Sequence, residues 1–114
     1  MRARATLRAS VESGNNWDDP SEDHLFMLVE DIERGDESYL IVERLSDSSG
    51  QSYIQTMRNE EGGFLVERRD GAPDKHFQTT ASDFRHAHAL IAAWAFGEPE
   101  VATPSEWLPV RFVG

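Results

Sequence analysis

The sequence predicts one α+β domain over residues 1–114, built from an antiparallel meander sheet of four to six strands and two helices, most simply packed on one face of the sheet. Three observations lead to this prediction. Two segments repeat apolar residues at helical spacing, and each has start and stop signals. Four short strand-like segments lie between them on loops of hairpin length. A chain of 114 residues also supports one domain and no more.

The best-marked element is a helix over about residues 20–34. Asp19 is the expected N-cap, Pro20 suits the first helical position, and Glu22 completes a capping box. Gly35 is the expected stop, since glycine adopts the left-handed conformation that ends many helices. The apolar stripe of this helix is Leu25, Leu28, Val29 and Ile32.

Alternating apolar residues separated by turn-forming breaks predict the strands. The central four are Tyr39–Leu45, Ser52–Arg58, Phe64–Arg69 and His76–Thr80. Their connections are rich in glycine, aspartate and asparagine and of hairpin length, so consecutive strands are expected to be antiparallel neighbours. Weak alternation adds a first strand over residues 6–11. Residues Trp107–Val113 are expected to form a short last strand, which Pro109 confines to an edge of the sheet.

A second helix is predicted over about Ser82–Phe96. Thr80 together with Asp83 offers the cap at its start, and Gly97 followed by Pro99 ends it. Both helices have an apolar stripe, so both are expected to pack on the sheet.

The net charge of −10 is concentrated in one part of the chain. Residues 11–50 contain twelve acidic residues, and their only bases are Arg34 and Arg44. A field of this sign repels nucleic acid and anionic membrane surfaces and speeds encounter with a basic protein. The alternative is that the acidic residues serve only to keep the protein soluble. The partner we expect is therefore a basic protein, with neither nucleic acid nor membrane as a ligand.

A cytoplasmic location is the expectation. The chain contains no cysteine, which excludes disulfides, thiolate zinc sites and cysteine nucleophiles, and which fits a reducing compartment. No apolar segment of signal-peptide type follows the charged first residues. The longest apolar stretch, residues 89–96, is far shorter than the ~20 residues of a membrane span.

The alternation also assigns the two faces of the predicted sheet. The residues expected to point toward the helices are Leu40, Val42, Ile54, Phe64, Val66 and Phe77. The opposite face then carries Tyr39, Ile41, Glu43, Tyr53, Gln55, Met57, Leu65, Glu67, Arg69, His76 and Gln78. Such a mixture of aromatic, aliphatic and polar residues is typical of protein interfaces. The candidate partner contacts on this face are Tyr53, Gln55, Glu67, Arg69, His76 and Gln78. A homodimer contact, a cover by the C-terminal segment, and an ordinary surface with scattered apolar residues are the alternatives.

A second candidate contact surface is an acidic rim. It consists of Trp17, Asp18, Asp19, Asp36 and Glu37. Trp17 and Trp107 both lie at the edges of predicted elements beside acidic residues, so each either closes the end of the core or anchors a partner.

The sequence predicts neither a metal site, a cofactor nor an enzyme. His86 and His88 are two residues apart on a predicted helix and therefore point in different directions. Neither a nucleophile elbow nor a phosphate-binding glycine loop is present. A small enzyme using Glu43, Glu67 and His76 is the least favoured reading, because cross-strand salt bridges with the nearby arginines explain such carboxylates more simply.

Several short motifs resemble a known family. They are Trp17-Asp-Asp-Pro20, Tyr53-Ile-Gln55, Gly63-Phe-Leu-Val-Glu67-Arg-Arg-Asp-Gly71, His76-Phe-Gln78, the second helix, Gly97 and Trp107. In this order they resemble the small α+β immunity proteins of bacterial polymorphic toxin systems, of the deaminase-associated kind. The resemblance covers roughly residues 15–108.

The resemblance implies a cytoplasmic bacterial antidote that binds a cognate toxin domain stoichiometrically and blocks its active site. Toxins that act on nucleic acids present basic clefts, and an acidic inhibitor complements them. A homodimeric interaction or scaffold module that uses the same sheet face is the main alternative.

Overall fold

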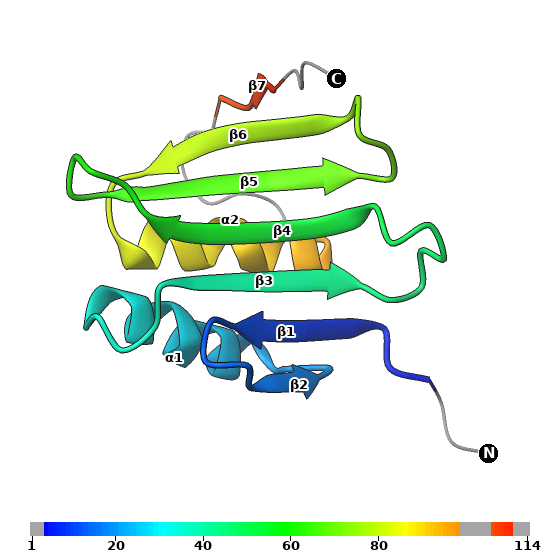
Figure 1. Cartoon of the computed structure of the whole chain (residues 1–114), viewed down its shortest axis with the longest axis horizontal. Coiled ribbons are helices and arrows are strands. Elements are labelled where there is room, and N and C mark those ends of the chain that lie inside the picture. Colours follow the sequence, from blue (N-terminus) through cyan, green and yellow to red (C-terminus); the bar gives the residue numbers. More distant parts are fainter. Residues whose placement is uncertain (1–3, 99–105, 111–114) are drawn as a thin grey trace.

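The computed structural model describes residues 4–98 and 106–110 as an antiparallel sheet of seven strands with two helices against one face (Figure 1). The strands are β1 (Leu7–Val11), β2 (Asn16–Asp18), β3 (Tyr39–Arg44), β4 (Ser52–Arg58), β5 (Phe64–Asp70), β6 (His76–Ala81) and β7 (Leu108–Pro109). The helices are α1 (Glu22–Glu33) and α2 (Phe84–Phe96). The strand order is β2-β1-β3-β4-β5-β6-β7, and every neighbouring pair is antiparallel. The α+β prediction is confirmed, with slightly more strands than expected.

The additional strand is β2, which pairs with β1 at the edge of the sheet. Its three residues, Asn16–Asp18, are too few and too polar to show an alternating pattern. At the other edge β7 contains two residues of the predicted last strand. Trp107 and Val110 lie just outside it, and residues 111–113 lie outside the described part of the chain.

The predicted meander and its two faces are confirmed in β3 to β6. Leu40, Val42, Ile54, Phe64 and Val66 are completely buried. Phe77 lies on the same side, opposite Arg68 of β5, and is half-buried. The apolar stripe of α1 and the buried face of α2 complete one continuous core. Burial of this apolar surface is the main force that fixes the helices on the sheet.

The start of α1 differs from the prediction, because Ser21 and not Asp19 is the N-cap. The Ser21 hydroxyl accepts a hydrogen bond of 3.0 Å from the His24 amide. Asp19 instead adopts a positive φ of 49°, and its Oδ1 accepts from the amide and the hydroxyl of Thr6 and from the Leu7 amide. The carboxylate thereby joins the start of β1 to the β2–α1 connection.

Replacing Asp19 with asparagine is expected to lower the free energy of unfolding at neutral pH, because an amide oxygen accepts weaker hydrogen bonds than a carboxylate. The hydrogen bonds from the backbone of Leu7 and Thr6 lower the pKa of Asp19 below its ordinary 3.8. Since the folded state has the lower pKa, the carboxylate stabilises the fold above pH 3.8, and this contribution is lost as the pH falls through the folded-state pKa. Urea unfolding at several pH values should show the difference from wild type shrinking in acid.

Asp74→Asn is the matched control for this experiment. Asp74 is exposed in the β5–β6 turn, and its carboxylate accepts no hydrogen bond within the described residues. The control removes the same charge, so equal stability losses in the two variants would contradict a specific role for Asp19.

The end of α2 lies at the predicted glycine, and of the two residues predicted to cap its start Asp83 does so, whereas Thr80 belongs to β6. The Asp83 side chain caps the helix by accepting from the His86 amide at 2.8 Å. Gly97 ends it with a φ of 68°, in the left-handed region. Neither helix in the described part of the chain is long and apolar enough to cross a membrane.

Candidate partner-binding face

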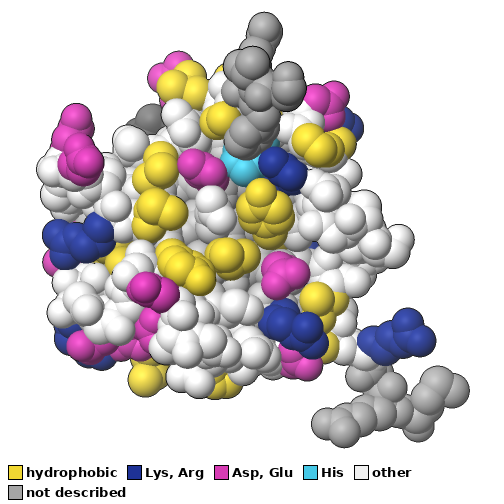
Figure 2. All heavy atoms as spheres, in the orientation of Figure 1, with side chains coloured by type: hydrophobic (Ala, Val, Ile, Leu, Met, Phe, Trp, Pro, Cys, Tyr) yellow, Lys and Arg dark blue, Asp and Glu magenta, His cyan; other side chains and the backbone are white. Residues whose placement is uncertain are grey.

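The face of the sheet away from the helices, called the open face below, carries a patch of large apolar side chains. Figure 2 views the molecule from this side and shows hydrophobic groups gathered across the middle of the face, with charged groups around them. The residues of this apolar patch are Tyr39, Ile41, Tyr53, Met57 and Leu65. Strand register makes the patch continuous, because Met57 lies between Tyr39 on β3 and Leu65 on β5. Met57 is 38% exposed, and the others are half-buried.

A group of hydrogen-bonded side chains, called the polar cluster below, borders the apolar patch. Its members are Gln51, Gln55, Glu67, Arg69 and His76. At its centre the Glu67 Oε2 atom lies 2.9 Å from His76 Nε2 and accepts a hydrogen bond of 3.1 Å from Gln55 Nε2. Three adjacent strands are thus joined through one carboxylate.

The hydrogen-bond network assigns the tautomer of His76. Arg69 Nε, which always carries hydrogen, donates to His76 Nδ1 at 3.2 Å. The Nδ1 atom must therefore present its lone pair, which places the ring hydrogen on Nε2, from where it is donated to Glu67. In this arrangement the His76 ring is the neutral tautomer that accepts from Arg69 and donates to Glu67.

Arg69 and Tyr53 are held in place by the same cluster. A terminal nitrogen of Arg69 donates to Gln51 Oε1 at 2.7 Å, and its guanidinium lies 5.5 Å from the centre of the Tyr53 ring. The Tyr53 ring also meets His76 edge-on, with ring centres 6.0 Å apart. Side chains ordered before binding lose less conformational entropy when a partner arrives.

The structure brings together five of the six residues predicted on this face, namely Tyr53, Gln55, Glu67, Arg69 and His76. The sixth, Gln78, lies directly opposite Glu67 on β6. His76 is only 2% exposed, and it supports its neighbours by hydrogen bonds to Glu67 and Arg69. Gln51 was not predicted, because it precedes β4 and only the strand register places it beside Arg69.

The acidic rim divides into two groups at opposite ends of β1. At one end Asp18 pairs with Arg8 at 2.8 Å, and this hydrogen bond raises the pKa of the Arg8 guanidinium. Asp19 lies beside it and is engaged by Thr6 and Leu7 as described above.

The second acidic group lies where β3 begins. Glu37 accepts hydrogen bonds from the amide and the hydroxyl of Ser13, and Asp36 pairs with Arg34 at 3.3 Å. The hydrogen bond that Arg34 donates to Asp36 raises the pKa of the Arg34 guanidinium. The length of β1, about 14 Å by strand rise, separates the two groups, so the rim is not one continuous surface.

Trp17 and Trp107, whose roles the sequence does not decide, both pack against the core. Trp17 lies opposite Ala9 on the helix side of the sheet and meets the His24 ring edge-on at 5.0 Å. Trp107 packs under the guanidinium of Arg68, which lies 4.5 Å from its ring centre. Their positions favour the reading that each closes an end of the core.

The residues of the enzyme alternative do not form an accessible acid–base pair. Glu67 and His76 are in contact, but His76 is buried. Glu43 lies opposite Tyr53 on the next strand but one from Glu67. Among the described residues of the open face, no exposed histidine lies beside a carboxylate.

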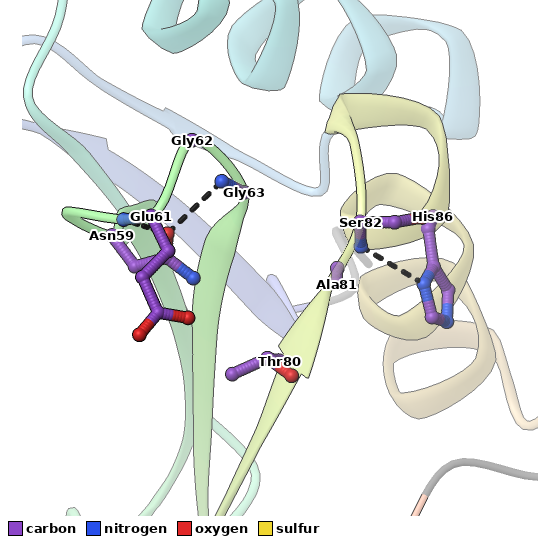
Figure 3. Close-up of a pocket in the computed structure, with 8 residues that line it drawn as sticks. All are labelled: Asn59, Glu61, Gly62, Gly63, Thr80, Ala81, Ser82 and His86. Carbon is purple, nitrogen blue, oxygen red and sulfur yellow. Dashed lines mark hydrogen bonds between the residues drawn. The ribbon is translucent and has the colours of Figure 1, made fainter.

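A shallow pocket of about 460 Å³ lies at the end of the sheet, between the β4–β5 turn and the start of α2 (Figure 3). Its lining residues are Asn59, Glu61, Gly62, Gly63, Thr80, Ala81, Ser82 and His86. The Asn59 side chain accepts from the Gly63 amide at 2.9 Å, and the Ser82 amide donates to His86 Nδ1 at 3.4 Å. Figure 3 shows Glu61 and His86 on opposite walls and not directed at one another. In the described part of the chain, no three histidine or carboxylate side chains are grouped as metal ligands.

Comparison of the chain with family models, with curated proteins and with solved structures gave no match. The function must therefore be argued from the surface itself.

Proposed function

We propose that this chain is a non-enzymatic binding protein, and specifically a cytoplasmic immunity protein that binds and neutralises a cognate bacterial toxin domain through the open face. The observation that carries the proposal is the apolar patch bordered by an already ordered polar cluster. Interfaces are enriched in tyrosine, methionine and arginine, and hot spots form where such groups are packed and preorganised.

Two further observations support a toxin as the partner. The motif resemblance to immunity proteins runs through the open face, where it includes Tyr53, Gln55 and Glu67. The net charge of −10 suits a basic partner such as a domain that cleaves or modifies nucleic acid. An inhibitor of this kind covers the basic cleft and excludes the nucleic acid substrate.

Co-expression tests the proposal directly. Toxin domains encoded beside this gene are expressed with and without it, and cell growth and complex formation are measured. We expect rescue of growth, a stable complex, and inhibition in vitro that is complete at one molecule per toxin. Rescue by amounts far below stoichiometric would indicate an enzyme, and the absence of any complex would contradict the proposal.

The acidic groups are expected to control the association rate. The double variant Asp18→Lys/Asp36→Lys changes the net charge from −10 to −6, since each substitution adds two positive charges. Both side chains are exposed and lie at opposite ends of β1. We expect the on-rate for a basic toxin to fall roughly two- to tenfold at low ionic strength, with little change in the off-rate.

Ionic strength supplies the control for the charge variant. At about 1 M salt the Debye length is about 3 Å, so the rates of the variant and of wild type should converge. An on-rate that depends on neither salt nor the substitutions would exclude electrostatic steering by these groups.

A further inference from the structure

We infer that the central contact on the open face is made by a positively charged side chain of the partner, an arginine or lysine, that binds the carboxylate of Glu67. This inference rests on the proposed function and adds the chemistry by which the partner is recognised. It concerns one residue of the polar cluster and its immediate neighbours.

The two oxygens of the Glu67 carboxylate are in different situations. Oε2 accepts from both His76 and Gln55, at 2.9 and 3.1 Å. Oε1 receives no hydrogen bond from the residues that the structure describes. The side chain is 22% exposed, so this oxygen belongs to a group that is held rigidly but remains within reach of a partner. An ionised carboxylate can accept about four hydrogen bonds, and the described residues supply two of them.

Among the residues that the structure describes, no arginine or lysine pairs with the Glu67 carboxylate. Among the described residues, the only basic group within 4 Å of the carboxylate is His76, which the network assigns as neutral. Arg69 lies two residues along β5, and its guanidinium donates to His76 and to Gln51. A half-buried carboxylate without a counter-ion is costly to desolvate further, so a partner that covers it gains from supplying a cation.

The surroundings of Glu67 favour a long cationic side chain in particular. Gln55, directly opposite on β4, donates through Nε2 to Glu67, which leaves its amide oxygen as a second acceptor on the same face. Two neighbouring acceptors suit a group with several N–H donors, as in guanidinium or ammonium. Leu65 and Met57 lie beside them and offer apolar surface to the aliphatic stem of arginine or lysine.

Charge also selects the kind of partner. A second copy of this chain would bring another net charge of −10 to the face, and the phosphates of a nucleic acid would meet the Glu67 carboxylate. A basic protein surface avoids both conflicts. The occupant of the open face is therefore a basic protein, and a homodimer becomes an outcome that the experiment must detect.

The test uses nuclear magnetic resonance on the labelled full chain, with a blocked Leu-Arg-Leu peptide as the probe. The matched control peptide replaces arginine with citrulline, which has the same shape and no charge. We expect millimolar arginine peptide to shift the side-chain resonances of Gln55 and Glu67, and citrulline peptide to leave them in place. Equal shifts with both peptides, no shift, or shifts confined to the acidic residues of α1 would overturn the inference. If the resonances of Met57 and Leu65 shift when the protein is diluted without peptide, the inference is overturned, and the occupant of the open face is a second copy of this chain.

Two variants separate this inference from the proposed function. Glu67→Gln keeps an acceptor for His76 and removes the charge, whereas Glu60→Gln removes the same charge from the exposed β4–β5 turn. With a toxin that the wild type binds, E67Q should lose about tenfold or more in affinity and E60Q should not. If both variants bind as wild type does, the Glu67 contact is refuted while the immunity function stands. If the wild type binds no toxin and the peptide shifts are still seen, the immunity function alone fails.

Discussion

Replacing Phe64 with alanine is expected to lower the free energy of unfolding by about 3–5 kcal/mol. Phe64 is the largest side chain that is completely buried, and it extends from β5 into the core beneath the helices. Its removal deletes apolar contacts and leaves a cavity that the surrounding sheet can only partly close. Domains of this size are stable by about 5–15 kcal/mol in total, so the variant should be close to the limit of folding. Equilibrium unfolding in urea measures the loss.

Leu65→Ala is the control on the adjacent position. Leu65 points to the opposite side of the sheet and is half-buried in the apolar patch. Its truncation should cost less than about 1 kcal/mol of stability, as at other partly exposed sites. Under the proposed function it should instead weaken binding to the toxin by raising the off-rate. If the two variants were equally unstable, the separation of the core face from the open face in β5 would be contradicted.

The two faces of the sheet could be predicted because side chains alternate between the faces along each strand. In β3, β4 and β5 the buried residues Val42, Ile54 and Val66 alternate with residues of the open face. Short turns fix the register between these strands. Once the buried face of one strand is assigned correctly, the buried faces of the neighbouring strands follow. The helices were predictable for a similar reason, since their apolar stripes extend over several turns.

The cap of α1 could not be decided from the sequence. Asp19 and Ser21 both have side chains that cap helices well. Ser21 takes this role because the Asp19 carboxylate is engaged by Thr6 and Leu7, which are twelve or more residues away along the chain. A local pattern does not contain such a contact. The three-residue strand β2 escaped prediction for the same reason, since pairing with β1 defines it.

The residues of the open face could be predicted, but which of them are exposed and which are buried could not. His76 occupies an outward position of β6 and was expected to contact a partner, yet it is 2% exposed. Gln51 contacts Arg69 across eighteen positions of sequence. Burial of a polar residue on an outward-facing position depends on the packing of its neighbours, which periodicity does not describe.

Replacing Glu67 with leucine is expected to destabilise the fold by about 1–3 kcal/mol, because the buried His76 Nε2–H group loses its acceptor. Glu43→Leu is the matched control. Glu43 is a half-buried glutamate on the same face, and its carboxylate accepts no hydrogen bond within the described residues. That substitution should change stability by no more than about 0.5 kcal/mol. Unfolding in urea compares the two variants.

A double-mutant cycle decides whether the cost comes from the unsatisfied histidine. His76→Phe alone removes the donor and leaves Glu67 with the hydrogen bond from Gln55. Combined with Glu67→Leu, it replaces both partners with apolar groups, and such paired replacements are often nearly neutral. We therefore expect the double variant to be more stable than the sum of the single losses predicts, by about 1 kcal/mol or more. Strict additivity would show that Glu67 and His76 stabilise the sheet independently. The polar cluster would then be a set of separate contacts and not a unit that orders the open face.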